Sequence, residues 1–158
     1  MKHQAFLDTF CDRWMEEWNR HSVDGLIGLI APDLVWEDLT FWTNVITSHA
    51  ELRRYIEKIF SVMPDVTFGE RARFIHPTRS QATILWRMEG SGPPGVASDK
   101  RYDFEGCDIF LEFRDGKLAH YQAAYDITHM MRQLEMLPQR GNRIGGAYFL
   151  ALLDPARR

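Results

Sequence analysis

The chain has 158 residues, of which 45% are hydrophobic, 26% charged and 13% aromatic, and its formal net charge is −3. This length and composition predict one globular domain with a sizeable core, and the charge gives no electrostatic reason to bind nucleic acid or an anionic membrane. Acidic residues interrupt the N-terminal segment where a signal peptide needs an apolar run, and no stretch approaches the roughly 20 apolar residues of a membrane span. The two cysteines, Cys11 and Cys107, form no CxxC pair. We therefore expect a reduced, cytoplasmic protein.

The first part of the chain has the pattern of helices around one strand. Aromatic rings recur at every fourth position and predict an amphipathic helix over residues 3–20, with its stripe packed into the core. A short second helix has apolar positions as far as Ile30 and is stopped by Pro32. A strand is predicted over residues 34–38, followed by a loop over 39–47.

The second part changes from helix to strand. Ser48 and Glu51 form a capping box that opens a third helix. The chain then shows the alternation and turn residues of strands, with Gly106 in one of them predicting a bulge. The predicted strands span residues 66–76, 82–89, 101–113 and 117–126, and a short helix over 128–137 follows. Helices followed by a bent run of antiparallel strands predict an α+β fold, in which a curved sheet wraps around three N-terminal helices and leaves a concave pocket.

The predicted domain covers residues 1–138, and residues 139–158 form a C-terminal tail. The tail contains a Gly-rich hinge and then an apolar patch over 148–153. Because free apolar surface favours association, we expect the tail to dock on its own domain or on a second subunit. A lid over the pocket is the more specific form of this expectation.

Alternation along two strands selects candidate polar residues. Arg87 and Glu89 share one face of their strand, where they form a buried pair if they face the pocket and a solvated pair if they face outward. Asp126 shares a face with the small residue Ala124 and with Gln122, which suits a cavity wall. An apolar cavity raises the pKa of a carboxyl group and fits it for acid/base work. The alternative is that Asp126 caps the helix that follows it.

Several kinds of chemistry lack a sequence motif. The six histidines show no HxH or HExxH spacing, which gives no support for a metal site. There is no GxSxG motif, no phosphate-binding glycine loop and no dinucleotide fingerprint. We therefore expect neither a metal nor a cofactor.

The order of the motifs resembles the SnoaL-like polyketide cyclases of the nuclear-transport-factor-2-like superfamily. The resemblance is carried by VWED after the short helix, WRMEGSG before a long loop, RDGKL as the last hairpin and AYDITHMMRQLEMLP as strand into helix. It implies a cone-shaped fold, a hydrophobic pocket and a homodimer. It also implies that Asp126 is the acid/base of cyclase members. Arg87 and Glu89 resemble the Arg–acid pair of the related limonene epoxide hydrolases.

These observations lead us to predict Asp126, Arg87 and Glu89 as catalytic residues. The predicted substrate-binding residues are Trp14, Trp18, Trp36, Asp38, Trp42, His49, Tyr102, Asp108, Gln122 and Ala124.

More than one function fits the sequence. The first is a cofactor-free acid/base enzyme of cyclase, isomerase or epoxide-hydrolase type, acting on a small polyketide-, terpenoid- or steroid-like molecule. The second is a binding or accessory protein with the same pocket and no chemistry, because no His occurs between residues 102 and 113 and because Trp36 and Asp38 replace the hydrolase group's Tyr and Asn. A steroid-isomerase-like role is the third, for which Tyr102 or Tyr121 with Asp38 are the available donor and acid.

Overall fold

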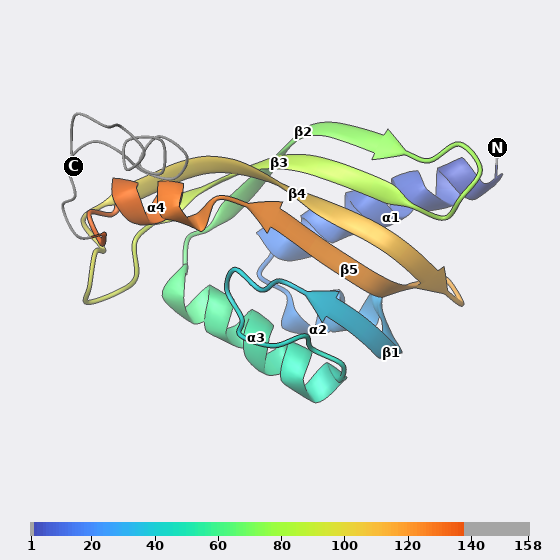
Figure 1. The fold of residues 1–158 in the computed structure, drawn as a ribbon, viewed down its shortest axis with the longest axis horizontal. Helices are drawn as coiled ribbons and strands as arrows, with labels where there is room; N and C mark the ends of the chain where they lie inside the picture. Colours follow the sequence, from blue (N-terminus) through green and yellow to red (C-terminus); the bar gives the residue numbers. More distant parts are fainter. Residues whose placement is uncertain (1, 138–158) are drawn as a thin grey trace, which may run out of the picture.

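The structure, a computed structural model, describes residues 2–137 of the chain (Figure 1). The predicted C-terminal tail lies outside these residues. The described elements in chain order are α1 (Lys2–Asn19), α2 (Val23–Gly28), β1 (Ile30–Glu37), α3 (His49–Val62), β2 (Thr67–Ile75), β3 (Ala82–Ser91), β4 (Arg101–Arg114), β5 (Lys117–Tyr125) and α4 (Ile127–Gln133). The α+β class and the order of helices and strands agree with the sequence prediction.

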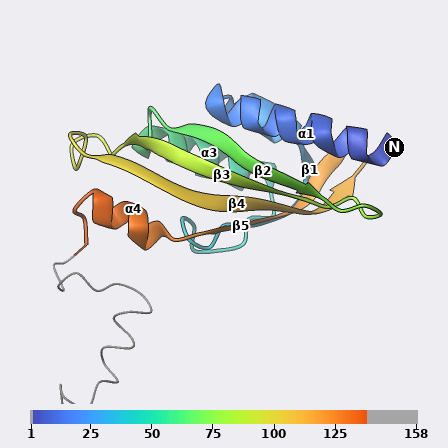
Figure 2. The same ribbon diagram turned by 90° about the horizontal axis from the view of Figure 1, so that it is seen from above.

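One five-stranded sheet organises the described residues, with the strand order β1-β5-β4-β3-β2. β1 pairs in parallel with β5, and the other neighbours are antiparallel. The sheet curves without closing. Figure 2 shows α1 along one face of the sheet and α4 on the other side. We call the face covered by α1 and α3 the inner face, and the opposite one the outer face.

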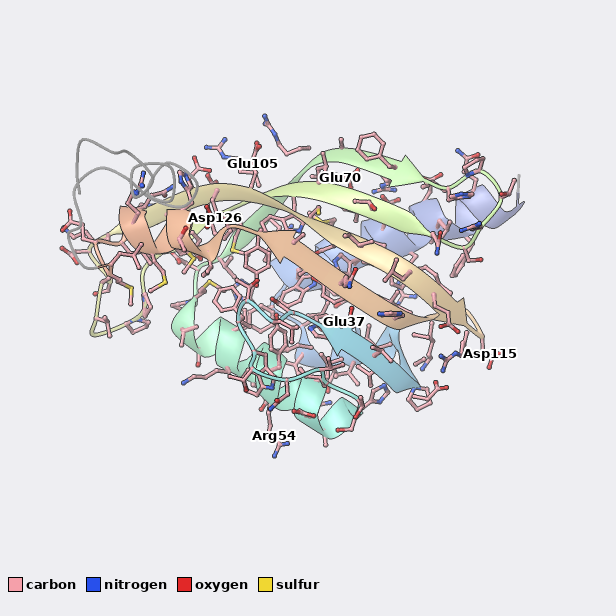
Figure 3. The ribbon with its side chains drawn as sticks, viewed as in Figure 1. Glu37, Arg54, Glu70, Glu105, Asp115 and Asp126 are labelled. Carbon is pink, nitrogen blue, oxygen red and sulfur yellow. The ribbon has the colours of Figure 1, made fainter. Side chains whose placement is uncertain are left out.

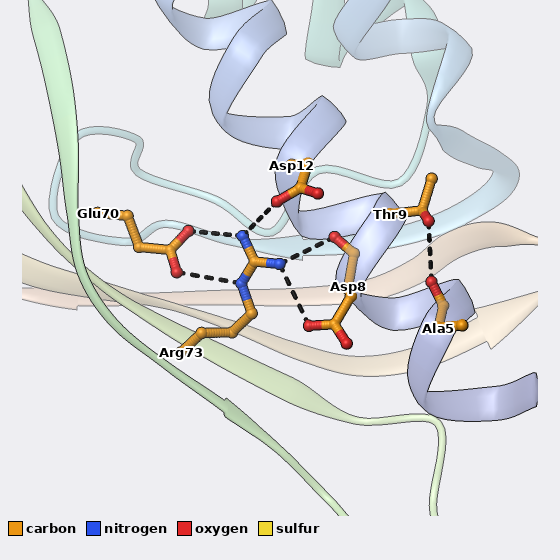
Figure 4. Close-up of polar contacts among 6 residues, drawn as sticks. All are labelled: Ala5, Asp8, Thr9, Asp12, Glu70 and Arg73. Atoms are coloured by element: carbon orange, nitrogen blue, oxygen red, sulfur yellow. Dashed lines mark hydrogen bonds and ion pairs between the residues drawn. The ribbon is translucent and has the colours of Figure 1, made fainter. Parts of the chain in front are cut away.

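Arg73 of β2 fastens α1 to the sheet (Figure 4). Its guanidinium donates to the backbone oxygen of Asp8 at 2.9 Å, to a carboxylate oxygen of Asp12 at 2.7 Å and to Glu70 at 2.7 Å. Because the Arg73 side chain is only 17% exposed, these contacts are weakly screened compared with ordinary surface pairs. They fix the helix near the turn that carries Trp14.

Three local predictions differ from the structure. α2 ends at Gly28, and Ile30 is already the first residue of β1. Pro32 lies within this strand, which is tolerated because β1 is at the edge of the sheet and needs fewer ladder hydrogen bonds. α4 ends at Gln133 rather than at residue 137. The predicted bulge at Gly106 is wrong, since the β3–β4 register runs through it without a shift.

Aromatic rings fill most of the space between the helices and the inner face. Trp14 lies at the centre, with ring centroids 5.1 Å from Phe110 and 5.5 Å from Tyr121. Trp36 stacks on Tyr121 at 3.9 Å. This confirms that the α1 stripe packs into the core. None of the helices in the described part is both long and apolar enough to span a membrane.

Candidate active site in the aromatic cone

A small cavity lies between α1, α3 and the inner face of the sheet. Its volume is about 30 Å³, and its walls are aromatic and aliphatic side chains together with two carboxyl groups, Asp38 and Asp108. A buried water needs roughly 10–15 Å³ of such space, so the cavity holds about two. A larger hollow, of about 510 Å³, lies on the charged outer face and is wide open to solvent. The buried carboxyl groups make the small cavity the better candidate for chemistry.

Asp108 projects from the middle of β4 into the cone and is only 6% exposed. The Trp14 indole Nε1 donates to its Oδ2 at 2.7 Å, and the Tyr121 hydroxyl donates to its Oδ1 at 2.7 Å. Burial raises the pKa of Asp108 to about 6, and the nearby donors from Tyr121, Trp14 and Trp86 oppose that rise. Asp108 therefore changes its protonation state close to neutral pH.

Asp38 follows β1 directly and is 3% exposed. The Tyr55 hydroxyl donates to its Oδ2 at 2.5 Å, and the Tyr125 hydroxyl donates to its Oδ1 at 2.6 Å. Burial first, and the Asp38 charge second, raise the pKa of both tyrosines. Both phenols thus stay protonated and remain donors. Asp38 lines the cavity from the position that directly follows the end of β1.

The two carboxyl groups are electrostatically coupled across the cavity. The Asp38 charge contributes to the raised pKa of Asp108. A buried, hydrogen-bonded carboxyl group that titrates near neutral pH can accept a proton and return it. Among the described residues, no cluster of three or more His, Cys, Asp and Glu side chains could hold a metal ion. The arrangement suits proton transfer to and from carbon or oxygen.

Asp126 is not in this cavity. It is exposed at the junction of β5 and α4, where it caps the helix by accepting a hydrogen bond from Thr128 N at 2.9 Å (Figure 3). The hydrogen bonds from Thr128 lower the pKa of Asp126. A carboxylate in this setting stays ionised near neutral pH, so the capping alternative fits the structure and the cavity-wall expectation does not.

Arg87 and Glu89 also lie away from the cavity. Their side chains are 44% and 51% exposed on the outer face of β3. Arg87 donates from Nε to Asp103 at 2.6 Å and bonds the same carboxylate through Nη2. Trp86 and Met88, on the alternate positions, point inward instead. The epoxide-hydrolase version of the function needs both charged groups in the pocket, and the structure places neither there.

The predicted binding residues divide between the cone and other places. Trp18, Asp38 and Asp108 line the cavity, and Trp14 contacts Asp108. Trp36 lies behind Tyr121 in the core, where it is not part of the cavity wall.

The remaining predicted binding residues serve other contacts. His49 Nε2 lies 3.0 Å from the Ala31 carbonyl oxygen, and Trp42 Nε1 donates to Glu51 at 3.4 Å. Tyr102 is 1% exposed and is not part of the cavity wall. Gln122 donates to Glu37 at 2.5 Å on the outer face, and Ala124 is exposed there. The prediction that Gln122 and Ala124 form a cavity wall is therefore wrong. Side chains alternate along β5, and Tyr121 and Tyr125 occupy the positions that face the cavity.

Tyr55 and Trp86 are site residues that the sequence prediction missed. Tyr55 lies on the buried stripe of α3 with Leu52, Ile56 and Ile59. A hydroxyl on such an apolar stripe needs a buried partner, and this signal was present in the sequence. Trp86 shares its strand face with Ile84 and Met88, which pointed to the core and gave no sign of the carboxyl groups nearby.

Comparison with known proteins identifies related domains and similar folds. A SnoaL-like domain model matches residues 11–121. A search of curated proteins found no match. AclR of Streptomyces galilaeus, described as a candidate hydroxylase, is 19% identical with a TM-score of 0.68, over 85% of this chain and 98% of that one. A candidate polyketide cyclase from Xanthomonas campestris pv. campestris is 13% identical with a TM-score of 0.71, over 84% and 98%.

A protein from Catenulispora acidiphila with a ketosteroid isomerase-like fold is 15% identical with a TM-score of 0.69, over 85% of this chain and 97% of that one. At these identities the solved structures support the fold alone. The domain match covers well over half of the chain. The chain therefore belongs to the SnoaL-like family, within the nuclear-transport-factor-2-like superfamily.

Proposed function

We propose that the protein binds a small hydrophobic molecule in its aromatic cone and catalyses a cofactor-free proton transfer on it, of the cyclase or isomerase type. The observation that carries this proposal is Asp108, a carboxyl group deep in the cone that titrates near neutral pH. Acid/base catalysis works best with a pKa near the working pH. Membership of the SnoaL-like family supports the same class of reaction.

The proposed reaction begins with Asp108 as the base. Its carboxylate takes a proton from a carbon next to a carbonyl group, the electron pair of the broken C–H bond forms a C=C bond, and the π pair of the carbonyl group moves to its oxygen. The proton on Asp108 then returns to a different carbon in an isomerisation. In a cyclisation, the enolate carbon attacks a second carbonyl carbon and the new alkoxide takes the proton. Trp14 and Tyr121 hold the Asp108 carboxylate in place throughout.

Asp38 supplies the second polar wall of the site. Its two tyrosine partners keep it hydrogen-bonded while Asp108 gains and loses its proton. The charge of Asp38 raises the pKa of Asp108, which assists the step in which Asp108 accepts a proton.

Ligand entry requires some side chains to move, because the cavity measures only about 30 Å³. Phe41 lies on the loop after β1, and Met63 and Met88 line the same cavity. Methionine is unbranched and adapts its shape readily. We expect these three side chains to open the cone for a ligand.

The test uses 2-tetralone, a two-ring ketone with exchangeable protons next to its carbonyl group. The protein is incubated with 2-tetralone in D₂O, and deuterium incorporation is followed by NMR. We expect exchange above the buffer rate with the native protein and loss of that excess in Asp108→Asn. Equal exchange rates with and without the native protein, for 2-tetralone and for smaller ketones, would contradict the proposal.

A non-catalytic binding protein is the second candidate. It is favoured by one observation: both oxygens of Asp38 and of Asp108 already accept hydrogen bonds from the protein. A carboxyl group whose two oxygens are both held by protein donors can serve structure alone. A ligand that raises the unfolding temperature, yet is recovered unchanged and undeuterated, supports this reading.

The homodimer that the family resemblance implies is a further proposal. Sedimentation equilibrium distinguishes one from two copies of the 18.5 kDa chain directly. A mass that stays at one copy across the concentration range would contradict it.

A further inference from the structure

Trp86 presents an unused hydrogen-bond donor at the cavity. The residue lies on the inner face of β3, is 2% exposed and lines the same cavity as Asp108. Its indole Nε1 is buried and has no hydrogen-bond partner among the residues that the structure describes. Buried donors in native proteins nearly always have a partner, so an exception at a cavity wall needs an explanation.

The groups around the Trp86 N–H are the two carboxyl groups of the cavity and the donors that bind them. The indole is close enough to Asp108 to help lower its pKa. However, the two Asp108 oxygens already accept from Trp14 and Tyr121 at 2.7 Å each. Both oxygens of Asp38 are likewise taken by tyrosine hydroxyls. The Trp86 N–H thus lies beside two carboxyl groups whose oxygens are already held by other donors, and it makes no hydrogen bond of its own within the part of the chain that the structure describes.

The position of the Trp86 ring depends on a glycine. A Cβ added at Gly106, its neighbour on β4, would lie 2.4 Å from Cη2 of Trp86. The ring also packs edge-on against Phe68 and Phe104. The indole is therefore held in place by its packing, as a donor that has to meet a ligand atom must be.

Two other buried polar atoms lack a partner within the described part of the chain, the Trp36 Nε1 and the Tyr102 hydroxyl. Neither residue lines the cavity. Trp36 consequently offers a matched comparison: an equally buried indole N–H that a ligand in the cone does not reach.

We propose that the Trp86 N–H donates to a carbonyl oxygen of the ligand, and that the ligands of the cone are neutral ketones. An indole N–H only donates, so the atom it meets must be an acceptor. Two carboxyl groups in the same cavity disfavour an anionic ligand, which leaves a neutral acceptor such as a carbonyl oxygen. This inference rests on the proposed function, because it concerns the same cavity.

The N–H also has a role in the proposed reaction. When Asp108 removes the proton, the negative charge passes from its carboxylate to the ligand oxygen. A preorganised donor at that oxygen stabilises the enolate more than the neutral ketone, and therefore lowers the barrier. Trp86 would then be a catalytic residue that contacts the reacting oxygen.

The test compares ligands that differ only in the carbonyl group. ¹⁵N-labelled protein is titrated with 2-tetralone and with tetralin, and a smaller pair, cyclohexanone and cyclohexane, covers a tighter cavity. The Trp86 indole signal is assigned as the one missing from the spectrum of Trp86→Phe. We expect ketones to move this signal to higher frequency more than their hydrocarbon partners do, and to leave the Trp36 signal in place.

Kinetics provides an independent readout. Removing one preorganised oxyanion donor lowers kcat by about 100-fold or more in known cases, so we expect a loss of that order for deuterium exchange in Trp86→Phe. Trp36→Phe should keep the preference for ketone over hydrocarbon in binding. A Trp86 signal that follows only the titration of Asp108, and responds to ketones no more than to hydrocarbons, overturns the inference.

The outcomes separate this inference from the proposed function. Exchange that depends on Asp108 but proceeds at the native rate in Trp86→Phe sustains the function and overturns the role of Trp86. A ketone-specific shift of the Trp86 signal without any exchange sustains ketone recognition and overturns catalysis.

Discussion

Along β4, the pKa of one aspartate is raised on the inner face of the sheet and that of another is lowered on the outer face. Asp103 and Asp108 belong to one strand, β4, at positions an odd number apart. Asp103 is on the outer face beside Arg87, whose hydrogen bonds lower its pKa, while burial on the inner face raises the pKa of Asp108 to about 6. The comparison shows that strand phase, more than residue type, decides which carboxyl group can do chemistry here.

The largest expected effect comes from exchanging the carboxyl groups for amides on each face. General acid/base groups contribute roughly 10²–10⁴-fold to rates, so we expect Asp108→Asn to lose that much of the enzyme-dependent exchange. Asp103→Asn is the matched control on the same strand and should keep the native rate. Similar losses in both variants would remove the distinction between the faces.

The second prediction concerns how the free energy of unfolding depends on pH. Asp108 has a folded pKa of about 6 against 3.8 for the free group, so between these values the folded protein holds the proton more tightly than the unfolded chain. The free energy of unfolding therefore falls as pH rises from about 4 to about 6, by about 3 kcal/mol from this group. Urea unfolding at several pH values measures it.

Exposed carboxyl groups outside the cavity act in the opposite direction and in another pH range. Asp65 and Asp126 have lowered pKa values, so their stabilisation is present above about pH 4 and is lost below it. In Asp108→Asn we expect the fall between pH 4 and 6 to disappear. Parallel profiles for the native protein and this variant would show that Asp108 is not the group responsible.

A substitution at Gly106 tests how tightly the Trp86 ring is packed. A methyl group at this position meets the Trp86 ring, so Gly106→Ala should lower the free energy of unfolding by about 1–3 kcal/mol. Gly69→Ala on β2 is the control, because its Cβ would meet nothing within 4 Å. Thermal or urea unfolding gives both values. A neutral effect at Gly106 would mean that the Trp86 ring is not tightly held.

The smallest expected effect is at Arg87. Its ion pair with Asp103 is exposed on the outer face, on the opposite side of the sheet from the chemistry proposed for the cone. We therefore expect Arg87→Met to leave ketone exchange unchanged, as measured in the D₂O assay. A clear loss of exchange would restore the residue to the site and undo the assignment of the two faces.

Much of the fold is predictable because the signals are local. The aromatic spacing in α1, the Ser48 cap of α3 and the alternation in β3 each reflect the geometry of one element. The sequence predicts Ile30 in a helix because an apolar residue fits both a helix face and a strand. Only pairing with Leu118 of β5, a contact distant in sequence, decides for the strand.

The site was harder to predict than the fold. Asp126 matched a family position, yet its place directly before a helix made it a cap. Asp108 carries a usable signal, since it alternates with the apolar residues Phe104 and Phe110 along its strand. Its partners, Trp14 and Tyr121, come from other elements, so their convergence depends on tertiary packing that spacing does not reveal.

The most direct test of the central claim is the titration of Asp108 itself. Side-chain carboxyl carbons of aspartate are labelled with ¹³C and followed by NMR across pH, with Asp108→Asn to assign the signal. The account predicts one aspartate that titrates with a midpoint near 6 and disappears in the variant. If Asp108 instead titrates in the ordinary range near 4 with the exposed aspartates, it is not the acid/base group of the cone.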